Sequence, residues 1–158
     1  MKDLRIEPVS GDTALRDWQR VHNLIIPTDP LSLDDIRERA GRNRLEVAYL
    51  GEVLVGCSTV RPPTAEADVA TVIARVLPEH RRQGLGARLY SHCLAYARTL
   101  GAAAIETVVL ESNPDGLRFA GAHGFREVER YLLPGDTVRF VDLRLDPGGA
   151  GTPSGTRE

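Results

Sequence analysis

Residues 76–87 read Val76-Leu77-Pro78-Glu79-His80-Arg81-Arg82-Gln83-Gly84-Leu85-Gly86-Ala87. An apolar stretch typical of a strand stops at Pro78, which lacks the N–H needed to continue a ladder. A basic, glycine-rich turn follows, and residues 84–100 then carry apolar side chains at the spacings of an amphipathic helix. The first turn of a helix has unpaired N–H groups and the positive end of the dipole. We interpret this segment as an anion-binding loop, in which Gly84 and Gly86 let a phosphate approach the backbone.

Two other phosphate-binding motifs do not fit this segment. The phosphate loop of nucleotide triphosphatases needs a Lys-Ser/Thr pair after a glycine, which the sequence lacks. The dinucleotide fingerprint fails at its third glycine, because Leu89 stands at that position, although Glu106 lies at a suitable distance for a ribose contact. Residues 78–83 also separate the strand from the first glycine, and too little chain follows for a doubly wound sheet.

The chain before this loop contains hairpin and helix signals. Ser32 and Asp35 form a capping box, and Gly51-Glu52 is typical of a hairpin turn. We expect strands at Leu4–Pro8, Leu45–Leu50, Val53–Val60 and Asp68–Val76, and helices from Asp12 or Thr13 to Ile25 and from Ser32 to Ala40.

The chain after the loop alternates again between strand and helix. We expect a helix at Gly84–Leu100, a strand at Ala104–Leu110, a helix at Asn113–His123, and strands at Arg126–Leu133 and Thr137–Leu145. The crossover helix makes the strands ending at Val76 and Leu110 parallel neighbours. The fold class is therefore α+β, with one domain over residues 1–146 and a disordered tail over residues 147–158, which contains no apolar side chain beyond Ala150.

Composition excludes several classes of function. The 158 residues fit one domain, and a net charge of −2 argues against a nucleic-acid-binding module. We expect no membrane span, because no apolar run approaches the ~20 residues required. Cys57 and Cys93 have no metal-ligand spacing, so we expect no metal site and interpret both as buried free thiols of a cytoplasmic protein, with a disulfide as the alternative. The first residues do not resemble a signal peptide.

Two motifs together resemble a known family. Arg81-x-x-Gly84-x-Gly86, preceded by Val76-x-Pro78, resembles motif A of the GCN5-related N-acetyltransferases (GNAT), and Asn113 followed by Gly124-Phe125 resembles a later family signature. The resemblance implies a GNAT fold. Its mixed, mostly antiparallel sheet would hold the seven strands expected above, flanked by the four helices, with the two parallel central strands splayed at an acetyl-CoA site.

The resemblance also implies the ligands and their contacts. Acetyl-CoA would act as co-substrate, and the acceptor would be a small-molecule or peptide amine. The cofactor contacts carried over from the family are Ala74, Arg75 and Val76 for the pantetheine and acetyl group, Arg81, Arg82, Gln83, Gly84, Leu85, Gly86 and Ala87 for the pyrophosphate loop, and Asn113. Asn113 also fits a helix N-cap, and the two roles are compatible. A homodimer is common in the family.

The reaction requires a base for the amine, an oxyanion donor and a proton for the leaving thiolate. We nominate Asp68 as the base, with Glu66 second, although both also fit solvated residues at a strand end; Glu106 and Glu111 flank the next strand. The backbone N–H of Val76 is the candidate oxyanion contact.

The usual general acid of the family is missing. Many members carry a tyrosine seven residues after the asparagine, where this chain has Ala120, and Tyr131 is the nearest substitute. Two alternatives to an active acetyltransferase therefore stay open. One is a non-catalytic module that binds and senses acyl-CoA, and the other is an interaction domain that keeps only the fold.

Overall fold

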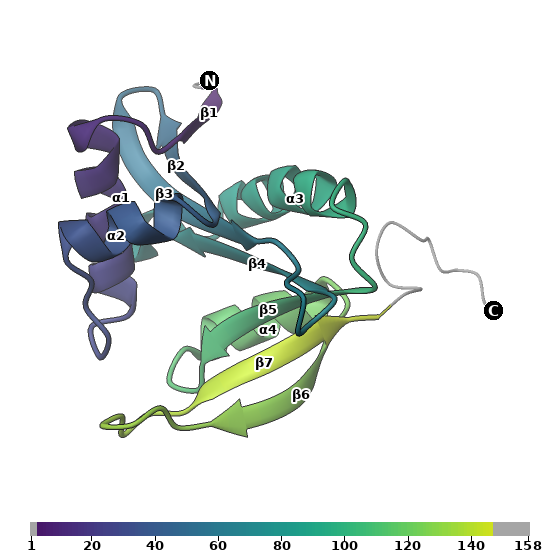
Figure 1. The fold of residues 1–158 in the computed structure, drawn as a ribbon. Helices are drawn as coiled ribbons and strands as arrows, with labels where there is room; N and C mark the ends of the chain where they lie inside the picture. The colour runs from purple at the N-terminus through teal and green to yellow at the C-terminus, as the bar shows by residue number, and fades with distance from the viewer. Residues whose placement is uncertain (1–2, 147–158) are drawn as a thin grey trace.

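The computed structural model describes residues 3–146, which form one seven-stranded sheet covered by helices (Figure 1). The sheet order is β1-β2-β3-β4-β5-β7-β6. The strands are β1 (Leu4–Pro8), β2 (Arg44–Leu50), β3 (Val53–Arg61), β4 (Val69–Val76), β5 (Ala104–Leu110), β6 (Phe125–Tyr131) and β7 (Phe140–Leu145). The helices are α1 (Asp12–Ile25), α2 (Leu33–Ala40), α3 (Leu85–Arg98) and α4 (Pro114–Ala122), with a 3₁₀ turn at Pro78–His80. The expected α+β architecture is confirmed.

The two central strands pair over only a short distance. β4 and β5 are parallel, as expected, with register pairs from Val69↔Ala104 to Thr71↔Glu106. Beyond Thr71, β4 continues against β3 as far as Val76, and β5 continues against β7 as far as Leu110. The two halves of the sheet therefore separate into a V-shaped gap, which Figure 1 shows between β4 and β5.

Two apolar cores hold the halves of the sheet in place. α3 and α4 pack on one face, where the larger core contains Val72, Leu89 and Phe125. α1 and α2 pack on the other face, where Trp18 and Ile36 are buried against β2 and β3. The second face of the β5–β7–β6 half carries no helix in Figure 1. This arrangement leaves an open face beside α1 and α2.

Local details confirm some predictions and correct others. The Ser32–Asp35 capping box forms, with reciprocal bonds of 3.0 and 3.1 Å. Helix α1 begins at Asp12, but its N-cap is Gly11 at φ 86°, which provides no side-chain cap. The sequence did not predict the order of the last strands. Because β7 pairs with β5, it lies between β5 and β6.

Cys57 and Cys93 are buried and free, which confirms the free-thiol interpretation. No helix within residues 3–146 is long and apolar enough to cross a membrane. The predicted tail, residues 147–158, lies outside the described residues.

Candidate functional site

The glycine-rich loop directs backbone N–H groups into open space. Arg82 and Gly84 have φ values of 65° and 77°, in the left-handed region that L-residues seldom adopt. The first N–H of the helix with a backbone partner is that of Arg88, which donates to the Gly84 carbonyl over 3.2 Å. Within the described residues, the N–H groups of Leu85, Gly86 and Ala87 have no backbone acceptor. Unpaired donors at the positive end of a helix form an anion-binding site.

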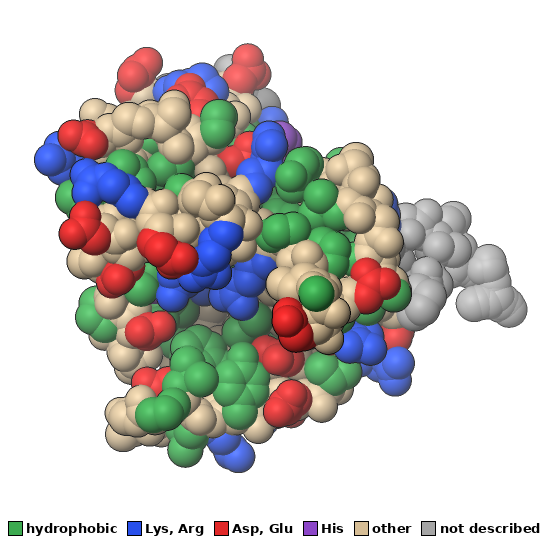
Figure 2. All heavy atoms as spheres, in the orientation of Figure 1, with side chains coloured by type: hydrophobic (Ala, Val, Ile, Leu, Met, Phe, Trp, Pro, Cys, Tyr) green, Lys and Arg blue, Asp and Glu red, His purple; other side chains and the backbone are tan. Residues whose placement is uncertain are grey.

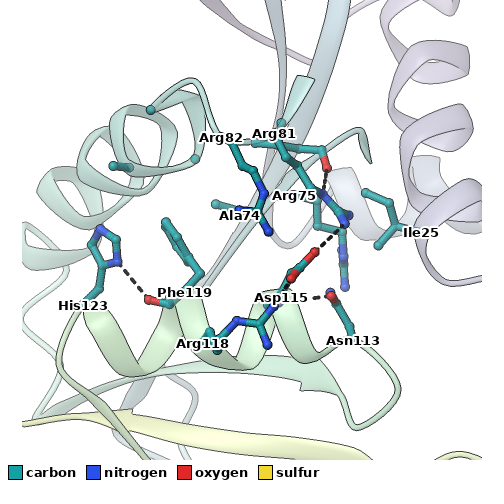
Figure 3. A pocket seen from close by; sticks show the side chains of 15 residues that line it. Ile25, Ala74, Arg75, Arg81, Arg82, Asn113, Asp115, Arg118, Phe119 and His123 are labelled. Carbon is teal, nitrogen blue, oxygen red and sulfur yellow. Dashed lines mark hydrogen bonds and ion pairs between the residues drawn. The ribbon is translucent and has the colours of Figure 1, made fainter. Parts of the chain in front are cut away.

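The two arginines of the loop have different surroundings. The Nε of Arg81 donates to the Val76 carbonyl over 2.9 Å, and its Nη1 lies 3.9 Å from Oδ2 of Asp115. Arg81 therefore ties the loop to the end of β4 and to α4. Arg82 has no ion-pair partner among residues 3–146, and Figure 3 shows it over the cavity described next. Arg82 is thus free to meet an anion.

A cavity of about 520 Å³ connects the loop to the gap between β4 and β5 (Figure 3). Its size falls within the usual range for small-molecule sites, ~300–1,000 Å³. The cavity is lined by the end of β4, the glycine-rich loop and one face of α4, with Ile25 at its edge: Ile25, Ala74, Arg75, Val76, Arg81, Arg82, Gly84, Gly86, Ala87, Asn113, Asp115, Gly116, Arg118, Phe119 and His123. A narrower cavity of about 60 Å³ continues between the strands, past Ile73, Val108 and Phe140.

Most of the predicted cofactor residues meet at this cavity. The cavity lining includes the predicted contacts Ala74, Arg75, Val76 and Asn113, together with every predicted loop residue except two. Leu85 is buried in the core, at 4% exposure, and the Gln83 side chain is exposed outside the lining. The side-chain oxygen of Asn113 accepts from the Gly116 N–H over 3.0 Å, so Asn113 caps α4 while lining the cavity.

The contribution of α4 was missing from the sequence analysis. Asp115, Arg118 and Phe119 line the cavity from one helix face. A Cβ added at Gly86 would lie 3.3 Å from Cε1 of Phe119, so the small residue permits close approach of α3 and α4. The i, i+3 and i+4 spacing of these three α4 residues was the available signal, because such residues share one face of a helix.

The backbone of β4 presents its polar groups to the gap at alternate residues. The Leu77 N–H donates to the Val55 carbonyl of β3 over 2.8 Å. In an antiparallel pair, only every second residue directs its N–H and C=O toward the partner strand. Val76 and its even-numbered neighbours on β4 therefore direct theirs toward the gap, consistent with a role for the Val76 N–H as a donor there.

Asp68 and Glu66 are not brought to this site. The Asp68 carbonyl accepts from the N–H groups of Ala103 and Ala104, at the closed end of the gap. Val72 is the first residue of β4 that lines either cavity. It lies roughly 13 Å from Asp68, because a strand rises ~3.3 Å per residue. A general base must act within hydrogen-bond reach or through one water. This placement argues against the predicted role of both carboxylates.

Another carboxylate, missed by the sequence analysis, lies one strand away from the gap. Asp142 of β7 is the register partner of Val108, which lines the narrow cavity. The Tyr131 hydroxyl donates to Oδ1 of Asp142 over 2.9 Å. Burial raises the pKa of Asp142 above its usual range, and burial together with this hydrogen bond raises the pKa of Tyr131 to about 12. Asp142 and Tyr131 thus form a hydrogen-bonded carboxylate–phenol pair on the open face.

The remaining acidic candidates are paired. Oε2 of Glu106 lies 2.6 Å from Nη2 of Arg144, and Glu111 lies 3.1 Å from both Arg130 and Arg139. Residues 3–146 contain no group of three or more His, Cys, Asp or Glu side chains arranged to hold a metal ion.

Three solved structures share this fold at low identity. The Salmonella typhimurium protein yncA, solved with its cofactor acetyl-CoA, is 15% identical, covers 97% of this chain and 99% of its own, and has a TM-score of 0.71. Arabidopsis thaliana Naa50, in complex with a bisubstrate analogue CoA-Ac-MVNAL, is 18% identical, with 90% and 98% coverage and a TM-score of 0.73. A variant of the spermidine N-acetyltransferase SpeG from Vibrio cholerae is 18% identical, with 90% and 92% coverage and a TM-score of 0.70.

Sequence comparison assigns the family. No curated protein matches the chain. A model of the acetyltransferase (GNAT) family matches residues 13–125, which include β4, the glycine-rich loop, α3 and α4. This chain belongs to the GNAT family of acetyltransferases.

Proposed function

We propose that the chain transfers an acetyl group from acetyl-CoA directly to the primary amine of a small-molecule or peptide acceptor. The observation that carries the proposal is the set of unpaired N–H groups at Leu85, Gly86 and Ala87, which open onto a cavity leading into the β4–β5 gap. An anion cradle joined to a strand edge matches a ligand with a pyrophosphate at one end and an amide-containing arm at the other.

The chain's own groups divide the binding task. The loop N–H groups and Arg82 hold the pyrophosphate, while the backbone polar groups of Ala74 pair with the pantetheine amides. The Val76 N–H serves as donor to the carbonyl oxygen of the thioester, where negative charge develops. Asn113 and the cavity face of α4 close the other side of the site.

Asp142 replaces Asp68 as the proposed proton acceptor. A free amine has a pKa of ~10.4, so it must lose a proton before attack. Asp142 lies on β7, next to the cavity-lining Val108 of β5, and burial raises its pKa above the usual range, which makes its carboxylate a better proton acceptor. The ammonium first loses one proton to water; as the free amine then forms the C–N bond and the C–S bond breaks, its second proton passes to Asp142. The departing thiolate, whose thiol has a pKa of ~8.5, takes a proton from water.

The test is release of the free CoA thiol when acetyl-CoA is mixed with a panel of amines. Amine-dependent thiol release supports the proposal. Tight acetyl-CoA binding without any thiol release identifies the non-catalytic sensing module. The buried Ala120 at the usual acid position favours this alternative. Failure to bind acetyl-CoA refutes both functions. The cytoplasmic location and the homodimer stay predictions.

A further inference from the structure

Three arginines on the α1–α2 side of the sheet have no ion-pair partner among residues 3–146. Arg75 of β4 lies opposite Cys57 of β3, and Arg61 of β3 lies opposite Thr71 of β4. Alternate residues of a strand share a face, so the side chains of Arg61 and Arg75 lie on the same side of the sheet, which α1 and α2 partly cover. Arg39 of α2 completes the group. Among residues 3–146, none of these three side chains has a hydrogen bond or an ion pair, whereas Arg130, Arg139 and Arg144 of the β5–β7–β6 half are paired.

The surroundings of this arginine cluster (Arg39, Arg61 and Arg75) disfavour its charges. Burial lowers the pKa of Arg61 and of Arg75 below the usual range, and the charges of the cluster lower it further. All three side chains are partly buried rather than extended into solvent. Burying a charge without a counter-charge is unfavourable, and a guanidinium binds a carboxylate or another oxyanion through paired hydrogen bonds. The cluster is therefore suited to hold an anion.

Acidic side chains occupy the other half of the same face. The acidic group consists of Asp142, Glu106 and Glu129. The charges of Glu106 and Glu129 raise the pKa of Asp142 beyond the effect of burial. Arg61 acts on Asp142 in the opposite direction, so the basic and acidic groups adjoin. Figure 2 shows basic side chains in the middle of this face and acidic side chains below them. Ile73, Arg75 and Val108 line the narrow cavity between the two groups.

We propose that the acceptor is a zwitterion, a primary amine that carries a carboxylate or another oxyanion, as an amino acid does. The oxyanion binds Arg75 and Arg61, and the amine lies toward Asp142 at the gap. A polyamine fits poorly, because the arginine cluster would repel its second cationic group. This inference rests on the proposed acetyl transfer, and it adds the chemical class of the acceptor.

The experiment compares matched acceptors. Each amino acid of a panel is assayed for thiol release beside its α-carboxamide and its decarboxylated amine. We expect kcat/KM to be at least about 50-fold higher for the carboxylates, since a hydrogen bond to a charged group is worth that order in binding. Arg61→Met should lower kcat/KM for the carboxylates by about 10- to 100-fold through KM. It should leave kcat/KM for the carboxamides and the decarboxylated amines unchanged. Arg98→Met, an exposed arginine at the end of α3, is the matched control and should change neither.

A second measurement separates the acceptor from the phosphates of the cofactor. Arg61 does not line the larger cavity, so calorimetry should give Arg61→Met the wild-type Kd for acetyl-CoA. A weakened Kd with unchanged acceptor preference would assign the arginine cluster to the cofactor and overturn the proposal. So would a preference for neutral or cationic amines.

Lack of turnover is treated separately, because it overturns the proposed function instead. In that case the same panel is titrated by calorimetry into the protein saturated with CoA. Carboxylate-dependent binding that Arg61→Met removes still supports the zwitterion site. Equal binding of acid and carboxamide, or no binding of either, overturns it.

Discussion

The hydroxyl of Tyr131 donates a 2.9 Å hydrogen bond to Oδ1 of Asp142, joining the facing ends of β6 and β7. Because Asp142 is the register partner of Val108, it lies one strand away from the β4–β5 gap. Ala120, at the position where many family members carry an acid, is 3% exposed in the core and has no proton to give. We therefore propose Asp142 as the proton acceptor, with Tyr131 as its hydrogen-bond donor.

Replacing Asp142 with Asn should lower kcat by about 10²- to 10³-fold, because the amide cannot accept the amine proton. The Kd for acetyl-CoA, measured by calorimetry, should stay within about twofold, since Asp142 does not line the larger cavity. Glu127→Gln is the matched control, because Glu127 lies on β6 and pairs with Arg130. A kcat loss below about threefold in Asp142→Asn would show that another group accepts the proton.

Replacing Tyr131 with Phe should lower kcat by less than about tenfold, because a phenol with a pKa near 12 is a poor acid for a thiolate. The hydrogen bond from Tyr131 lowers the pKa of Asp142, so its removal should move the acidic limb of the pH–rate profile to higher pH. A loss above about 10²-fold that also removes the basic limb would identify Tyr131 as the general acid.

His22 should make the fold acid-sensitive. Burial lowers its pKa from 6.5 to about 4, and the neighbouring charge of Arg75 adds to this effect. The unfolded chain then binds more protons than the native state between these pH values, so stability falls as pH drops through this window. Urea unfolding at pH 7 and pH 4.5 should show a loss of about 2 to 3 kcal/mol from His22 alone. His22→Gln should lack this part of the loss, and an identical pH dependence in both proteins would contradict it.

Replacing Gly84 with Val should weaken acetyl-CoA binding at least about tenfold. A Cβ at Gly84 meets no atom within 4 Å, so the cause is the φ of 77°, which a β-branched residue adopts only with strain of about 1–3 kcal/mol. The stabilisation of the wild type at one hundred times Kd, about 2.7 kcal/mol, should fall to about 1.4 kcal/mol or less in a thermal melt at the same ligand concentration. Gly121→Val is the control, because Gly121 also faces open space, on α4. Wild-type affinity for acetyl-CoA in Gly84→Val would contradict the assignment of this loop as the anion-binding site.

The predictable part of the site is local in sequence. The strand, loop and helix around Gly84 follow from glycine, proline and apolar spacing, and the short β4–β5 pairing follows from a right-handed crossover. The part that the sequence did not indicate depends on register between distant strands. Asp68 directly precedes the strand that carries the cofactor contacts but lies at its far end, while Asp142 comes next to Val108 only because β7 pairs with β5. No local pattern fixes that pairing, so no sequence signal singled out Asp142.

The most direct test of the account is a crystal structure of the chain with acetyl-CoA. The account predicts pyrophosphate oxygens within about 2.7–3.2 Å of the backbone nitrogens of Leu85, Gly86 or Ala87. It also predicts the thioester in the β4–β5 gap, with its carbonyl oxygen toward the Val76 N–H and its carbon on the side of Asp142. A pyrophosphate bound away from this loop, or a thioester outside the gap, would contradict the central claim.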